Sequence, residues 1–122
     1  MGTFDAVGRG VTDVRQFNIL DASERRLCPI CGVPDFAGEP AYDERGGLAG
    51  ITICPCCLWE PGFDDDPHAS AAAQPSIIDS IRTYRSNWEA AGQWGGRKAE
   101  VPPGWDAAAQ LRHLFSTAPH VR

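Results

Sequence analysis

The sequence predicts a small α+β domain, in which a module with two Cys-x-x-Cys turns and a short antiparallel sheet packs against two C-terminal helices. Three observations support this prediction. Two Cys-x-x-C motifs occupy residues 28–31 and 54–57. The β-branched run Ile51-Thr52-Ile53 leads directly into the second motif, as a short strand would. Beyond residue 75, two segments carry apolar residues at helical spacing.

Length and composition fit one domain over residues 1–122. The 13 Gly and 10 Pro make the chain rich in loops, which suits a small domain that a metal holds together. Within the domain we expect residues 1–10 to be flexible, residues 27–67 to form the cysteine module and residues 76–122 to be helical.

The strands are expected in the first half of the chain. The alternation Phe17-Asn18-Ile19 favours a short strand within residues 11–20, and Asp21 is placed to cap a helical turn that leads to Arg25. A second strand is expected at residues 41–43, followed by a hairpin turn over residues 43–47. A third strand is expected over residues 48–54 and leads directly into the second cysteine motif.

The first helix is predicted to begin after Ser76, a natural N-cap, and to end at Gly92. Its outward face should carry Arg82, Arg85 and Asn87. The second helix should run from an Asp106 cap to about Ser116, and Pro119 should end it. The apolar stripes of the two helices are Ile77, Ile81, Tyr84 and Trp88, and then Ala107, Ala108, Leu111, Leu114 and Phe115.

The paired motifs predict a metal site. A tight turn carries both sulfurs of a Cys-x-x-C to one side, and the 22 residues between the motifs can fold back to bring the pairs together. Four thiolates around one cation form a closed tetrahedral site, which is typical of structural zinc. We therefore predict one Zn²⁺ per chain in a zinc ribbon, with Cys28, Cys31, Cys54 and Cys57 as its ligands.

Other cysteine chemistries fit less well. A thioredoxin-like site needs a helix after the first motif, and Gly32-Val33-Pro34 prevents one. Iron in a rubredoxin-like site stays open, because the ligands are the same, although Leu58 stands where the second rubredoxin knuckle ends in Gly. The fifth cysteine, Cys56, is expected to be a small buried side chain, with exchange into the metal site as its alternative.

Charge and hydropathy bear on location and partners. The formal net charge is −5, with −8 on residues 31–81 and +3 on residues 82–122. An acidic metal module repels phosphate, so we expect a protein partner with a basic surface rather than nucleic acid. The alternative is nucleic-acid binding through Arg82, Arg85, Arg97, Lys98 and Arg112. Because no membrane-spanning run and no signal peptide are present, we expect a cytoplasmic protein.

Trp94 and the acidic run at residues 64–66 are further candidates for binding. Trp94, in a Gly-rich loop, is either an interface anchor or a cover for the metal module. Asp64-Asp65-Asp66 is either a solvated run or a contact for a basic partner. Trp59 is expected to pack over the second motif, and the histidines are expected at the surface.

The segments CPICG and ICPCCLWEPGFDDD, with the Ile-rich helix that follows, resemble the cysteine-rich CPCC family of small bacterial proteins. The chain departs from the family pattern at Ile30, at Leu58, in the doubled Cys56-Cys57 and at Pro61-Gly62. The resemblance implies a zinc-ribbon-like protein, and some such proteins lie among toxin and immunity genes. It therefore favours a non-enzymatic binding module, such as an immunity or adaptor protein, over an electron-transfer protein or a nucleic-acid-binding one.

Overall fold

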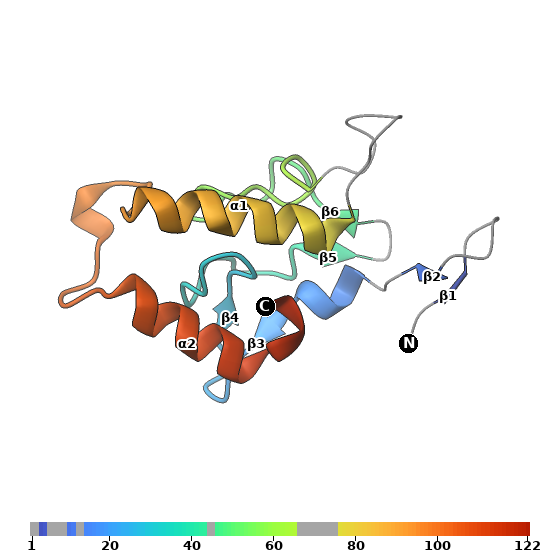
Figure 1. Cartoon of the computed structure of the whole chain (residues 1–122), viewed down its shortest axis with the longest axis horizontal. Helices are drawn as coiled ribbons and strands as arrows, with labels where there is room; N and C mark the ends of the chain where they lie inside the picture. The colour runs from blue at the N-terminus through green and yellow to red at the C-terminus, as the bar shows by residue number, and fades with distance from the viewer. Residues whose placement is uncertain (1–2, 5–9, 12–13, 44–45, 66–75) are drawn as a thin grey trace.

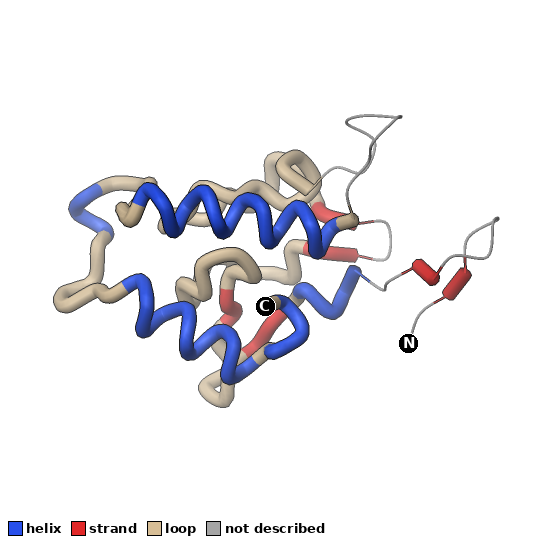
Figure 2. The backbone as a smooth tube through the Cα atoms, viewed as in Figure 1, coloured by secondary structure: helices blue, strands red, loops and turns tan. Residues whose placement is uncertain are grey.

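The computed structural model describes residues 3–4, 10–11, 14–43, 46–65 and 76–122. Over these ranges the chain is α+β, with short antiparallel strand pairs first and two α-helices after them. Loops and turns make up much of the first half (Figure 2). In Figure 1, α1 and α2 lie on either side of the teal loop that follows β4.

Every described strand is two residues long. The pairs are β1 (Thr3–Phe4) with β2 (Gly10–Val11), β3 (Ile19–Leu20) with β4 (Arg26–Leu27), and β5 (Tyr42–Asp43) with β6 (Gly46–Gly47). The last pair confirms the strand expected at residues 41–43. The expected flexibility of residues 1–10 falls largely on residues 1–2 and 5–9, outside the described ranges. Ladders this short contribute few hydrogen bonds, so the first half needs another source of stability.

Asp21 forms the turn between β3 and β4, and the helical turn predicted there is wrong. Its Oδ1 accepts the backbone N–H groups of Ser23 and Arg25, which gives the chain a tight turn in place of a helix. Its Oδ2 lies 2.7 Å from the Arg25 guanidinium and 3.1 Å from His113 Nε2 of α2. The backbone N–H of Arg25, with these partners, holds the pKa of Asp21 well below its usual range.

The strand predicted over residues 48–54 is wrong. Residues 49–51 form a turn around Gly50 (φ +75°), and residues 52–54 continue without a strand assignment. Ile51 and Ile53 are 65% and 55% exposed, so the apolar run does not face the core. The strand expected within residues 11–20 forms only at Ile19–Leu20, because the 3₁₀ helix η1 (Val14–Phe17) precedes it.

Both predicted helices are present with their predicted N-caps. The α1 helix spans Ile77–Ala91, the Ser76 side chain accepts the N–H of Asp79, and Gly92 closes it in the left-handed conformation (φ +65°). The α2 helix spans Ala107–Thr117, and Asp106 accepts the N–H of Ala108. Two 3₁₀ helices, η2 (Lys98–Glu100) and η3 (Pro119–Val121), lie before and after α2. Pro119 therefore begins a further helical turn.

The core joins the helices to the cysteine region. All five cysteines are buried, and they lie in one cluster with apolar side chains from residues 14–42, 54–59 and 77–121. The largest of these fully buried side chains are Trp59, Phe17, Leu27, Ile30, Ile81, Leu114 and Val121. In the described part of the chain, neither α-helix has the length and apolar character of a membrane span.

The orientation predicted for one side of α1 is wrong at Arg85. This arginine is 5% exposed and points inward between the buried Ile81 and Trp88, whereas Arg82 and Asn87 are exposed as expected. A charged side chain is almost never buried this fully unless its donors are satisfied, so the partners of Arg85 bear directly on the site.

Candidate metal centre

The four predicted ligands come together in the structure. The Sγ atoms of Cys28, Cys31, Cys54 and Cys57 all lie within 4.8 Å of one another, and all four residues are buried. Cys28 Sγ is 3.7 Å from Cys57 Sγ, and Cys31 Sγ is 3.6 Å from Cys54 Sγ. Zn–S bonds of about 2.3 Å in a tetrahedron place sulfurs about 3.8 Å apart, so the spacing suits one tetrahedral cation.

The two cysteine turns share one backbone pattern. We call residues 28–32 the first knuckle and residues 54–58 the second knuckle. In the first, the N–H of Gly32 donates to the carbonyl of Cys28 and the N–H of Cys28 to the carbonyl of Val33. In the second, Leu58 donates to Cys54 and Cys54 donates to Trp59. The local sequence therefore folds twice into the same turn, and the two copies face each other across the sulfurs.

The last residue of each knuckle is in the left-handed region. Gly32 has φ +83° and Leu58 has φ +66°. Gly32 also needs to lack a side chain, because a Cβ there would lie 2.8 Å from the Gln110 carbonyl oxygen and from Leu114 Cβ of α2. Leu58 is 47% exposed, so the second knuckle accepts a side chain but retains the strain of a left-handed leucine.

Electrostatics in the cluster favours a cation. Burial raises the pKa values of Cys31 and Cys57 well above the ordinary thiol value. Burial also raises the pKa of Cys28, but hydrogen bonds from the other three thiols outweigh it, so its net pKa is lowered. A divalent cation would offset the cost of burying charged sulfurs and allow all four to coordinate as thiolates.

Helix α1 holds both knuckles through adjacent residues. The Arg85 guanidinium donates to the carbonyls of Pro29 (2.7 Å) and Ile30 (2.7 Å), inside the first knuckle, and to Val121 of η3 (2.6 Å). The Tyr84 hydroxyl donates to the carbonyl of Cys57 (2.8 Å), in the second knuckle. Burial raises the pKa of Tyr84 to about 12, so this donor keeps its proton at neutral pH.

Helix α2 reaches the cluster through one side chain. Gln110 Nε2 donates to the carbonyl of Cys31 (2.9 Å) and lies 3.5 Å from Cys56 Sγ, while its Oε1 accepts the indole N–H of Trp105. From the connection between the helices, the N–H of Gly95 donates to the carbonyl of Cys56 (2.6 Å). Both helices and the loop that joins them therefore hold the knuckles by hydrogen bonds.

The other residues singled out in the sequence, which are Cys56, two tryptophans and the histidines, do not belong to the four-sulfur group. Cys56 is buried outside the four-sulfur group, as expected of a spare cysteine. Trp59 is fully buried and its indole N–H donates to the Tyr42 hydroxyl. Trp94 is half-buried, and its ring packs edge-to-face against Trp105 at 5.4 Å, so it belongs to an aromatic cluster. Of the histidines, His113 and His120 are exposed, and His68 lies outside the described residues.

The acidic run is not uniformly solvated. Asp65 is 2% exposed, its Oδ1 accepts the N–H of Gly62, and burial raises its pKa. Its Oδ2 has no hydrogen-bond partner among the described residues. Asp64 accepts the N–H of Glu60, and Asp66 lies outside the described ranges. This segment is a folded loop, of which only part faces solvent.

Arg85, Tyr84 and Gln110 are the residues around the site that sequence patterns did not identify. Tyr84 was assigned to the apolar stripe, with no hydrogen-bonding role, and Gln110 carried no signal. For Arg85 the signal existed: it is four residues after Ile81 and three before Trp88, which places it on the buried stripe. An arginine in that position indicates buried carbonyl acceptors.

The knuckle geometry predicts opposite effects for two substitutions. Gly32→Ala should lower the free energy of unfolding by about 2 kcal/mol or more, because the new Cβ meets α2 in a left-handed turn. Leu58→Gly should raise it by up to about 1 kcal/mol, because the strain is relieved and little packing is lost. Denaturant titration of the metal-loaded proteins measures both, and equal effects at the two positions would contradict the assigned geometry.

The three hydrogen bonds that Arg85 donates to the carbonyls of residues 29, 30 and 121, which we call the arginine clamp, predict a second result. Arg85→Lys keeps a positive charge but cannot reach three carbonyls with a planar fork, so unfolding should become easier by about 2–4 kcal/mol. Metal affinity, measured by competition with a chromophoric chelator, should fall with it. Arg82→Lys is the control, because Arg82 is exposed on the same helix and donates to the Arg122 carbonyl rather than to a knuckle; it should leave metal affinity unchanged and cost at most about 1 kcal/mol. A wild-type affinity in Arg85→Lys would contradict the clamp.

Comparisons with known proteins identify no family. No protein-family model matches the chain, and no solved structure matches it. The chain is 28% identical over 79 residues to the uncharacterized protein YozI of Bacillus subtilis (strain 168). That alignment covers 62% of this chain and 65% of YozI, slightly less than two thirds of the latter's length.

Proposed function

We propose that the chain is a zinc-binding, non-enzymatic module of zinc-ribbon type, with one Zn²⁺ per chain. The observation that supports this most directly is the group of four buried sulfurs within 4.8 Å of one another. Thiolates are the donors that zinc takes in structural sites, and the resemblance to the CPCC family of small bacterial proteins agrees with that donor set. Five free thiols favour a reducing compartment, such as the cytoplasm.

The non-enzymatic part of the proposal follows from the donor set. Four protein ligands leave no open position for a substrate or a catalytic water. Among the described residues, no second group of His, Cys, Asp or Glu is arranged to hold a metal ion. The metal would therefore stabilise the fold, and the function would depend on the surface of the folded protein.

We propose that this surface is a protein-binding one, and that the module serves as an adaptor or immunity protein. Four of the five exposed large apolar side chains among the described residues lie on residues 51–63: Ile51, Ile53, Leu58 and Phe63. Phe63 is 70% exposed. Glu60 and Asp64 lie in the same loop, and residues 31–81 carry a formal charge of −8. Exposed apolar groups beside carboxylates suit a partner with a basic, partly apolar surface.

A rubredoxin-like iron site is the second candidate, and one observation removes the sequence argument against it. Leu58 adopts the left-handed conformation that a glycine would provide at the end of a knuckle. Its identity is therefore no argument against iron, and the four sulfurs suit either ion. Nucleic-acid binding is weakened, because Arg85, one of its five candidate bases, is buried against carbonyls.

Metal analysis with paired variants tests the proposal. The purified protein should hold one zinc by mass spectrometry and be colourless, and a strong chelator should unfold it, since structural zinc supplies about 10–16 kcal/mol. Cys57→Ala should abolish tight binding, whereas Cys56→Ala, next to it, should keep the metal and lose only about 1 kcal/mol of stability.

Other outcomes would distinguish iron from zinc, identify the ligands and locate the partner surface. Visible absorption from a ferric tetrathiolate, or iron as the bound metal, would support electron transfer and overturn the zinc proposal. Equal loss of metal in both variants would mean that Cys56 is a ligand. Binding to a basic protein partner should disappear in Phe63→Ala and persist in Leu20→Ala, an exposed apolar residue outside this segment.

A further inference from the structure

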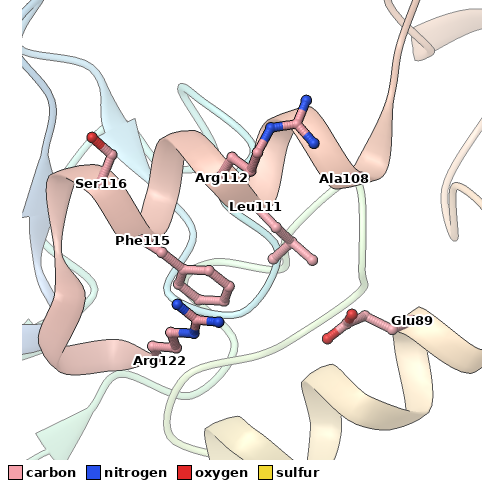
Figure 3. Close-up of a pocket in the computed structure, with 7 residues that line it drawn as sticks. All are labelled: Glu89, Ala108, Leu111, Arg112, Phe115, Ser116 and Arg122. Atoms are coloured by element: carbon pink, nitrogen blue, oxygen red, sulfur yellow. The ribbon is translucent and has the colours of Figure 1, made fainter.

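A groove runs along the seam between α1 and α2. It consists of two adjoining hollows of about 580 Å³ and 190 Å³, which share Glu89, Ala108 and Leu111 in their linings. The smaller hollow extends to Trp88 and Gly92, and the larger one extends to Phe115, Ser116 and Arg122. Figure 3 shows the larger hollow, with Leu111 and Phe115 on α2 facing Glu89 of α1.

The floor of this groove is apolar and its rim is polar. Leu111 and Trp88 are each 7% exposed, and Phe115 is half-buried. Rim residues such as Ala108, Arg112 and Ser116 are exposed. The larger hollow is within the range of about 300–1,000 Å³ found for ligand sites, but the groove extends beyond it along the helix pair. This elongated shape suits a third helix laid along the seam.

The charge on the rim indicates the partner's sign. Arg112 and Arg122 line the α2 side of the groove and Glu89 lines its α1 side, so the rim carries two cations against one carboxylate. The Arg122 guanidinium lies 5.4 Å from the centre of the Phe115 ring, so it stands at the edge of the apolar floor. Arg112 pairs with no carboxylate among the described residues. Residues 82–122 carry a formal charge of +3, so the surroundings reinforce these two cations.

We propose that this groove docks an amphipathic helix of an acidic partner protein. Apolar side chains at positions i, i+3 or i+4, and i+7 of that helix fill the groove above Leu111, Phe115 and Trp88. Carboxylates beside them meet Arg112 and Arg122. The groove is built from α1, α2, Gly92 and Arg122 and contains no residue of the segment 51–64, so the proposal is independent of the basic partner proposed above. Together the two surfaces would let one small protein bridge partners of opposite charge.

The test uses the full-length, metal-loaded chain and a designed probe. The probe is a fluorescein-labelled helical peptide of about five turns, with Leu at the stated spacing and Glu on both flanks. A second peptide replaces every Glu by Lys. Fluorescence anisotropy gives the affinities, and ¹⁵N–¹H correlation spectra locate the contacts. We expect binding of the Glu peptide that weakens as salt is added, with shifts concentrated on the amides of Ala107, Ala108, Leu111, Phe115 and Arg122.

Matched variants show whether peptide binding depends on residues of the groove or on charge and helix surface elsewhere in the protein. Arg112→Gln should weaken binding about fivefold to tenfold, whereas Arg97→Gln, an exposed base outside the groove, should not. Ala108→Gln places a longer side chain on the rim and should weaken binding, while Ala109→Gln, exposed at the next position of α2, should leave it unchanged. All four positions are exposed, so the variants should fold.

Several results would overturn the proposal. Equal affinity for the Lys peptide would show that charge does not select the partner. Shifts on residues 51–64, or no binding by either peptide, would show that the groove is not the docking site. The same groove shifts produced by a DNA duplex, or by raising protein concentration without peptide, would assign the surface to nucleic acid or to a second copy of the chain.

Discussion

Four sulfur atoms in a dry interior, all within 4.8 Å of one another, are the constraint on which the rest of the structure depends. Burial disfavours ionisation of these thiols, and crowding prevents all four from ionising unless a cation is shared among them. A single divalent ion would remove both difficulties. It would also join two turns that are separated by more than 20 residues and that no long sheet connects within the described part of the chain. The strand pairs, two residues each, would not hold these turns together.

The helices complete the centre by binding its backbone. Arg85 and Tyr84, adjacent on α1, each donate to carbonyls of a different knuckle, and Gln110 of α2 donates to a third position. Four thiolates and a divalent cation leave a net charge of −2, so a buried arginine beside them is electrostatically favoured. Its desolvation, which lowers the pKa of Arg85, is offset by three short hydrogen bonds. Metal binding at this site would therefore be coupled energetically to helix packing.

Sequence patterns predicted the parts that local chemistry determines. Cys-x-x-C spacing identified the four clustered cysteines, and Ser76, Gly92 and Asp106 marked helix ends because caps act within one turn. The failures arose where distant groups decide. Ile51 and Ile53 have strand propensity, but they are exposed and pair with no strand among the described residues. The Asp21 carboxylate accepts two backbone N–H groups and thereby forms a turn in place of the expected helix. The spacing of Arg85 from Ile81 and Trp88 indicates its inward position, but its acceptors, the carbonyls of residues 29, 30 and 121, are distant in sequence and no local pattern identifies them.

X-ray absorption spectroscopy at the edge of the bound metal examines the four-sulfur site itself, because it reports the donor atoms and their distances without unfolding the protein. We expect a zinc edge and a single shell of four sulfur atoms at about 2.3 Å, with no nitrogen or oxygen scatterer in that shell. A shell with three sulfurs and a light atom, or a protein that binds no metal and whose cysteines form disulfides, would contradict it.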